Sequence, residues 1–307
     1  MTTRENIYYC QPVFRPPSEA RSLLIQVTEG CTFQCDFCMS NLRKQFIVRE
    51  EDEIKRDLDI AKKIYGTGVR RIFFLDGNAM VTPFTKLLEI TKYANQVFPK
   101  LERCGVYAHS KDILKKTDEQ LKELSEAGLK IAYVGFESGY TELLKEVHKH
   151  ANKEDHLQAA KKLFNANITL SATFINGLGG GNNPEISEKH AIESADLVNK
   201  ICPEDERKWY IAFLTLMVPQ GTKMYELKKK GVFAEMDQMQ ILKELKMFVE
   251  HIEFKNKNAN CIFRANHASN YLPIKGVLEK DKDKILNTIN YGLTHPELLR
   301  PEFYRAL

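Results

Sequence analysis

The sequence predicts an α/β fold built on a mostly parallel sheet. Six β-rich runs recur along the chain, each followed by a segment with helical spacing of apolar residues. The expected strands are residues 22–28, 71–75, 104–108, 130–136, 168–175 and 209–218. Six strand–helix units in succession indicate parallel strands joined by right-handed crossovers. The repeat alone fits either an open sheet or a barrel.

Local signals set the ends of several helices. Thr117, with a glutamine three residues later, predicts a capping box, and Gly128 marks the end of that helix. Thr82 precedes a proline and is expected to cap the helix after the second strand. Ser187 is expected to open another helix that runs to about residue 201.

The C-terminal part departs from the regular alternation. Residues 237–254 predict a long amphipathic helix, and residues 261–264 are a candidate seventh strand. No linker rich in proline, glycine or serine interrupts the chain. We therefore expect an extended segment over residues 1–20, a core over 21–225 and an extension over 226–307 that packs on the core.

Composition narrows the class of protein. The chain has 307 residues, of which 43% are hydrophobic and 28% charged, as in globular proteins. Its formal net charge of +4 is mildly basic and does not call for a nucleic-acid partner. The N-terminus lacks a signal-peptide pattern, and the longest apolar run is too short for a membrane helix. A cytoplasmic protein without a membrane partner is expected.

Three of the seven cysteines stand close together. Cys31, Cys35 and Cys38 follow the first strand directly, with the spacing C-x3-C-x2-C. The carboxyl ends of parallel strands are where such folds place their active sites. Thiolates select iron–sulfur clusters or zinc, and a structural zinc site needs four ligands. Because no fourth Cys or His occurs before Cys104, we predict an iron–sulfur cluster with one iron open to a further ligand. The alternative is a zinc knuckle completed by a distant residue.

With Phe37 included, the motif C-x3-C-x-F-C resembles the signature of the radical S-adenosylmethionine enzymes. Segments after the second, fourth and fifth strands resemble cofactor-binding elements of the same family: residues 75–79 (LDGNA), 135–139 (GFESG) and 175–180 (INGLGG). The likeness extends over residues 22–220. It implies a partial (β/α)6 TIM-like barrel with a C-terminal helical and strand extension, in a small subgroup of unassigned reaction.

The resemblance also implies which residues contact S-adenosylmethionine. The expected set is Phe37 near adenine, Asp76, Gly77 and Asn78 near the methionine amino group, Glu137 and Ser138 near the ribose, and Gly177. Ser171 is expected on a different ground: it shares one face of the fifth strand with Thr173 and could contact the cofactor if that face lines the lumen. The usual Gly-Gly-Glu of the family is Asp-Gly-Asn here, so the amino group would meet Asp76 or backbone carbonyls. For Glu137 the alternative is a structural ion pair inside the barrel.

Substrate contacts are expected at two places. Tyr107 and His109 end the third strand, where an ordinary core role is an equal alternative. Arg264, His267 and Asn270 lie in an unusually polar segment, which could equally be a capped turn.

The implied chemistry is reductive cleavage of S-adenosylmethionine at a single 4Fe–4S cluster, giving a 5′-deoxyadenosyl radical. The electron would come from an external low-potential donor, a flavodoxin- or ferredoxin-like protein. Hydrogen would then be abstracted from a small or medium-sized organic substrate, of which a tetrapyrrole-like molecule is one candidate. No cobalamin domain, second cysteine cluster or tRNA-binding barrel is expected.

Two other functions stay open at this point. A non-catalytic iron–sulfur sensor or electron carrier would explain the cysteines but not the other strand-end segments. Radical modification of a macromolecule is the alternative among enzymes.

Overall fold

The structure, a computed structural model, describes residues 5–306, and its main sheet has eight strands. In sheet order these are β1 (Leu23–Gln26), β4 (Arg71–Leu75), β5 (Arg103–Ala108), β6 (Leu129–Glu137), β7 (Thr169–Asn176), β8 (Lys208–Thr215), β9 (Asn260–Ala265) and β10 (Ile274–Val277). The sheet is mostly parallel, and β1 and β10 are its edges, so it is not a closed barrel. The chain divides into two compact units, which are described separately.

The first unit comprises the residues up to Phe33, Ser40–Val134 and Lys161–Leu170. Its strands β1, β4, β5 and the start of β6 pair in parallel, and a small antiparallel pair joins β2 (Thr28–Glu29) to β3 (Ile47–Val48). Its helices are η1 (Pro17–Glu19), α1 (Glu51–Tyr65), η2 (Ala79–Val81), α2 (Phe84–Val97), α3 (Ser110–Leu114) and α4 (Asp118–Glu126). Each crossover helix buries one apolar face, as Ile54 and Leu58 do in α1.

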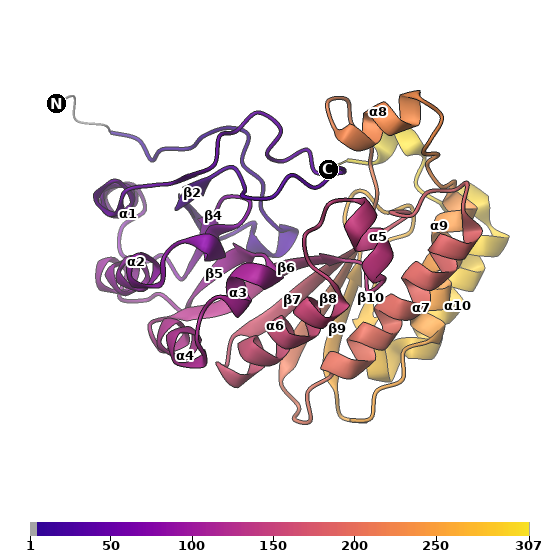
Figure 1. The fold of residues 1–307 in the computed structure, drawn as a ribbon. Coiled ribbons are helices and arrows are strands. Elements are labelled where there is room, and N and C mark those ends of the chain that lie inside the picture. The colour runs from indigo at the N-terminus through magenta and orange to yellow at the C-terminus, as the bar shows by residue number, and fades with distance from the viewer. Residues whose placement is uncertain (1–4, 307) are drawn as a thin grey trace. The chain divides into compact units, whose positions relative to one another are not determined.

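The second unit comprises Gln34–Met39, Gly135–Ala160 and the residues from Ser171 onward. Strands β7, β8 and β9 run parallel, and β10 pairs antiparallel with β9. The helices are α5 (Thr141–Glu146), the first part of α6 (Lys153–Asn165), α7 (Pro184–Ile201), α8 (Lys223–Lys229), α9 (Gln238–Glu250), α10 (Leu278–Thr294), η3 (Pro296–Leu298) and η4 (Glu302–Tyr304). The residues of α6 from Lys161 onward belong to the first unit. In Figure 1, α7, α9 and α10 lie side by side along these strands.

Strand alternation gives the sheet of the second unit two different faces. We call the side of Phe174, Phe213 and Phe263 the aromatic face; these rings are buried and pack around Phe248 of α9. The pairs Ser171–Tyr210, Ala212–Arg264 and Arg264–Lys275 in the strand register place these residues together on the opposite side. We call that side the polar face.

The structure confirms the predicted fold class and all seven expected strands. The capping box at Thr117 is also present. Two predicted caps were wrong. Helix α7 begins at Pro184, because the Asn183 side chain accepts a hydrogen bond from the Ile186 N–H and a proline fits the first helical position. Thr82 ends η2 and does not cap α2.

Strand β10 was not expected; the division into core and extension stays a prediction. Among the described residues, no helix is long and apolar enough to span a membrane.

Candidate functional site

The cysteine loop begins just after β2. Cys31, Cys35 and Cys38 are all partly exposed, and the Cys31 sulfur accepts the backbone N–H of Phe33 at 3.5 Å. Hydrogen bonds to thiolate sulfur are one means by which proteins tune iron–sulfur clusters, so this donor set fits such a cluster. The described residues contain no group of three or more Cys, His, Asp or Glu side chains gathered for a metal ion. The ligand role of the three cysteines therefore rests on their spacing.

Gly77 lets the end of β4 approach this loop closely. A Cβ atom at Gly77 would lie 2.6 Å from the Asn41 side-chain nitrogen and 3.0 Å from the Cys31 Cβ. Real Cβ atoms rarely come so near, so a larger residue at position 77 would have to push aside the Asn41 side chain and crowd the Cys31 side chain. The structure thus brings together two segments that the sequence assigned to cluster and cofactor.

Asp76 is engaged within the protein. Its buried carboxylate forms an ion pair with Lys44 at 2.5 Å and accepts hydrogen bonds from the Gly30 N–H and the Gln26 side chain, both at 3.3 Å. These contacts anchor the start of the cysteine loop to the end of β4. Lys44 was not singled out from the sequence, because it lies 32 residues from Asp76 and a lysine is ordinarily exposed at the surface.

The contacts of Asn78 explain why this position carries an amide in place of the glutamate that is usual in the family it resembles. Its Nδ2 donates to the Asp112 carboxylate at 2.6 Å, and its Oδ1 accepts the His109 backbone N–H at 3.0 Å. A glutamate here would bring a second carboxylate beside Asp112, whereas an amide can donate and accept at once. Asn78 is therefore part of the framework that joins β4 to α3.

Tyr107 near the end of β5 and His109 just after it both contact other parts of the first unit. The His109 ring stacks on Phe33 with centroids 3.8 Å apart, and its Nδ1 accepts the Lys111 N–H as the cap of α3. Tyr107 packs edge-on against Phe73 and Tyr133, and burial raises its pKa. The core alternative thus describes what both side chains contact, and their role toward substrate stays a prediction.

Asp36 and Phe37, which lie between the last two cysteines, are both held in place by contacts within the second unit. Phe37 packs against an apolar cluster that includes Leu143, Val147 and Met224. The buried Asp36 carboxylate lies 3.0 Å from the His148 ring and 3.2 Å from the Lys223 ammonium. This part of the loop is fixed by α5 and α8.

Glu137, at the end of β6, forms the ion pair that was the alternative to a ribose contact. The Lys149 ammonium lies 2.9 Å from its Oε1, and both side chains are largely buried. Glu137 also has a positive φ of 64°, which turns the chain out of the strand. The contact of Glu137 with the ribose stays a prediction.

A buried polar network joins two of the expected cofactor segments. The Ser138 hydroxyl lies 2.8 Å from Nδ1 of His190, and Nε2 of His190 lies 3.6 Å from Glu244. Glu244 accepts the Gly177 N–H at 2.7 Å and the Ser187 hydroxyl at 2.5 Å. Burial lowers the pKa of His190 despite the nearby carboxylate. The ends of β6 and β7 are thereby tied to α7 and α9.

His190 and Glu244 were missed at the sequence level, although one signal was present. Glu244 interrupts the apolar stripe of the predicted helix 237–254, between Ile241 and Phe248. A carboxylate on a buried stripe requires partners, but the sequence does not say which strand ends supply them.

The polar C-terminal segment is held against the end of β8. Asn270 donates to the Phe213 carbonyl at 2.8 Å and accepts the Thr215 hydroxyl at 2.9 Å. His267 accepts the Ser269 N–H as a local turn, and burial lowers its pKa. The capped-turn alternative therefore describes His267.

Arg264 and Ser171 lie on the polar face, as does Tyr210. Arg264 places its guanidinium over the Tyr210 ring, 4.4 Å from the centroid. Ser171 is buried opposite Tyr210 in the register.

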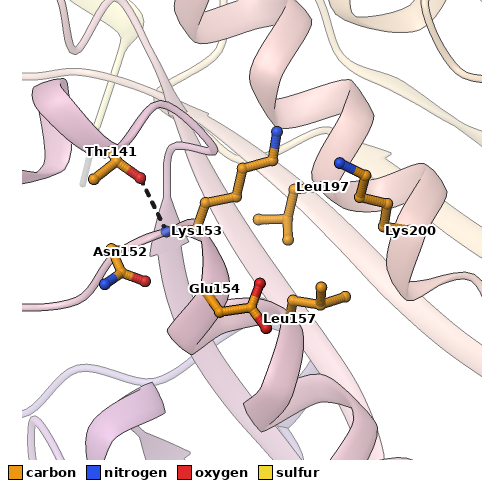
Figure 2. Close-up of a pocket in the computed structure, with 7 residues that line it drawn as sticks. All are labelled: Thr141, Asn152, Lys153, Glu154, Leu157, Leu197 and Lys200. Atoms are coloured by element: carbon orange, nitrogen blue, oxygen red, sulfur yellow. Dashed lines mark hydrogen bonds between the residues drawn. The ribbon is translucent and has the colours of Figure 1, made fainter.

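Figure 2 shows a separate cavity of about 390 Å³ on the helical side of the second unit. It is lined by Thr141, Asn152, Lys153, Glu154, Leu157, Leu197 and Lys200. None of the predicted site residues lines it. Its two lysines already pair with acidic residues of α7, namely Lys153 with Glu193 and Asp196, and Lys200 with Asp196.

Comparison with known proteins gives a consistent result. A model of the "Radical SAM superfamily" matches residues 25–189. The chain is 23% identical over 259 residues to GTP 3′,8-cyclase of Clostridium perfringens (strain 13 / Type A), covering 83% of this chain and 69% of the relative.

Three solved structures resemble the fold. Coproporphyrinogen III oxidase of Escherichia coli has a TM-score of 0.58 at 14% identity, over 75% of this chain and 52% of the oxidase. The methyltransferase TsrM of Kitasatospora setae, with cobalamin and a [4Fe–4S] cluster bound, has a TM-score of 0.55 at 16% identity, over 73% and 44%. Methylornithine synthase has a TM-score of 0.51 at 15% identity, over 90% and 81%. The chain spans about half the length of the first two, and all three support the predicted partial barrel.

Proposed function

Because this chain belongs to the radical S-adenosylmethionine superfamily, we propose that it cleaves S-adenosylmethionine reductively and abstracts hydrogen from a small or medium-sized organic molecule. Membership establishes an enzyme whose cofactors are a 4Fe–4S cluster and S-adenosylmethionine. Beyond membership, we propose both the hydrogen abstraction and the residues that take part in it.

Cys31, Cys35 and Cys38 are the proposed cluster ligands. The observation that carries this assignment is their spacing inside the matched region, together with the close approach of Gly77 to Cys31. When bound, the cluster supplies the electron that splits the sulfonium of S-adenosylmethionine into methionine and a 5′-deoxyadenosyl radical. The protein's own part is to hold S-adenosylmethionine and the reacting carbon of the substrate close together in a fixed orientation and to exclude water.

The remaining strand-end residues would position S-adenosylmethionine. Ser138 and Gly177 are held by His190 and Glu244, so their backbone and hydroxyl groups are fixed before the ligand arrives. Such preorganisation lowers the cost of ordering the site on binding. We propose that Asp76 acts through the start of the cysteine loop, which it anchors, and Asn78 through the junction of β4 and α3.

Family membership supports a small-molecule substrate. Radical enzymes of this family use small-molecule substrates and external reductants. The named relative acts on GTP and one structural neighbour on a porphyrinogen, so a nucleotide and a tetrapyrrole are both candidates here. The flavodoxin- or ferredoxin-like donor and the cytoplasmic location stay predictions.

Anaerobic reconstitution tests the proposal. The purified chain, loaded with iron and sulfide and reduced, should convert S-adenosylmethionine to 5′-deoxyadenosine, measured by liquid chromatography. Cys35→Ser should lose the cluster absorption and the product. Cys202→Ser, which replaces another partly exposed cysteine, should keep both.

Two results would contradict the proposal. One is a tetrahedral zinc ion bound by the three cysteines in protein purified without oxygen. The other is a reduced cluster whose electron paramagnetic resonance spectrum ignores added S-adenosylmethionine, which would favour an electron carrier.

A further inference from the structure

The polar face carries positive charge that the protein does not neutralise. Arg264 and Lys275 are directly opposite each other in the antiparallel pair of β9 and β10. Like charges at such a position repel and destabilise a sheet. Within the part of the chain that the structure describes, neither side chain forms an ion pair or hydrogen bond with a carboxylate.

A third cation approaches the same place. Lys208 and Arg264 both lie over the ring of Tyr210, 5.6 Å and 4.4 Å from its centroid. The half-buried Arg264 is held by this ring and keeps its N–H donors available. An arginine stacked on a ring presents a planar fork that matches the oxygens of a phosphate or carboxylate.

A cavity of about 390 Å³ opens beside these residues. Arg264, Asn266 and Lys275 supply its donors, and Ile262 and Val277 supply apolar wall. Asp281 also lines the cavity, but its Oδ2 accepts the Val277 N–H at 2.7 Å. One oxygen of this carboxylate is thereby occupied by a backbone hydrogen bond at the start of α10.

The common alternative is that the charges form a solvated surface. That reading accounts for the exposed Lys275 but leaves unexplained why a half-buried arginine faces a lysine across the strand pair beside a cavity. A dianionic ligand group would balance the two charges and accept from the arginine fork and the Asn266 amide.

We propose that Arg264 and Lys275, with Asn266, form a binding site for the phosphate group of a small phosphorylated molecule. That this molecule is the substrate rests on the proposed function. The site itself does not, because it is defined by residues that touch neither cluster nor S-adenosylmethionine in the proposal.

Calorimetric titration of the reconstituted enzyme with inorganic phosphate and pyrophosphate tests the site. Both anions should bind saturably. Arg264→Gln and Lys275→Gln should each weaken pyrophosphate binding at least tenfold, about the effect of one lost charge-assisted hydrogen bond. Lys229→Gln, an exposed lysine at the end of α8, should leave it unchanged.

Acetate serves as the comparison ligand and should bind at least tenfold more weakly than phosphate. The site would be refuted by three outcomes: no saturable phosphate binding, binding unchanged in both variants, or acetate binding as tightly as phosphate. Circular dichroism melts of the variants confirm that they are folded.

The same preparations separate this inference from the proposed function. The wild type and the control Lys229→Gln should form equal amounts of 5′-deoxyadenosine without added substrate. Should the wild type form none, the proposed function fails, whereas the pyrophosphate titrations still decide the phosphate site.

Discussion

The aromatic face and the polar face of the second unit are built from alternate residues of the same strands. On the first, the Phe213 ring lies 5.3 Å from Phe174 and 4.5 Å from Phe248, and all three are fully buried. On the second, Tyr210 carries cations that have no acidic partner among the described residues. A period of two residues therefore separates the side chains that stabilise the fold from those available to a ligand.

The largest expected effect is on the aromatic face. Replacing Phe213 by alanine should lower the free energy of unfolding by about 3–5 kcal/mol, because the rings around it cannot close the cavity. Urea denaturation of the reconstituted protein under anaerobic conditions measures the change.

The matched control is Arg264→Gln. Arg264 lies on the polar face of β9, the strand that pairs with β8. Removing this half-buried charge should change the free energy of unfolding by at most about 1 kcal/mol, because the lost cation–π contact with Tyr210 is offset by relief of the repulsion from Lys275. If both substitutions cost the same, the separation of the two faces would be wrong.

An intermediate effect is expected at Glu244, the polar exception on the helix that covers the aromatic face. Glu244→Ala leaves the Gly177 N–H and the Ser187 hydroxyl without their partner, which should cost about 2–4 kcal/mol. Glu244→Gln keeps an acceptor and should cost less than half as much. Equal losses would mean that packing, and not hydrogen bonding, is what Glu244 supplies.

A smaller effect should appear with pH through His190. Burial lowers its pKa in the folded state, so the unfolded chain binds the proton more readily. The contribution of neutral His190 is complete above the unfolded pKa of about 6.5 and is lost as the pH falls below it, by roughly 1 kcal/mol per pH unit.

Urea midpoints between pH 7.5 and pH 5.0 measure this dependence. In His190→Gln, which keeps a polar side chain beside Ser138, the decline on acidification should be smaller than in the wild type. A decline of the same slope would show that other groups dominate the acid sensitivity.

The fold could be predicted because its signals are local. Short β-rich runs located every parallel strand of the main sheet, and the spacing of Thr117 and Gln120 located a helix cap. Strand β10 was missed because four residues that include Lys275 and Gly276 give too short a pattern. The Asn183 cap was missed because Ser187 offered a competing signal a few residues later.

The site was predictable only in part, for a related reason. The cysteine spacing is a local pattern, whereas Glu244 lies 67 residues from Gly177 and Asn78 lies 34 residues from Asp112. Such pairings depend on how the strands are assembled. The sequence could indicate that Glu137 needs a partner, but Lys149 is reached only through the turn of α5.

Strand β10 also has a consequence for how the chain behaves at high concentration. It is the last strand of the sheet, it is only four residues long, and it carries an exposed lysine. Brief, charged borders of this kind discourage a second molecule from adding its own strand. The residue proposed to hold a phosphate would thus also help to keep neighbouring copies from joining sheet to sheet.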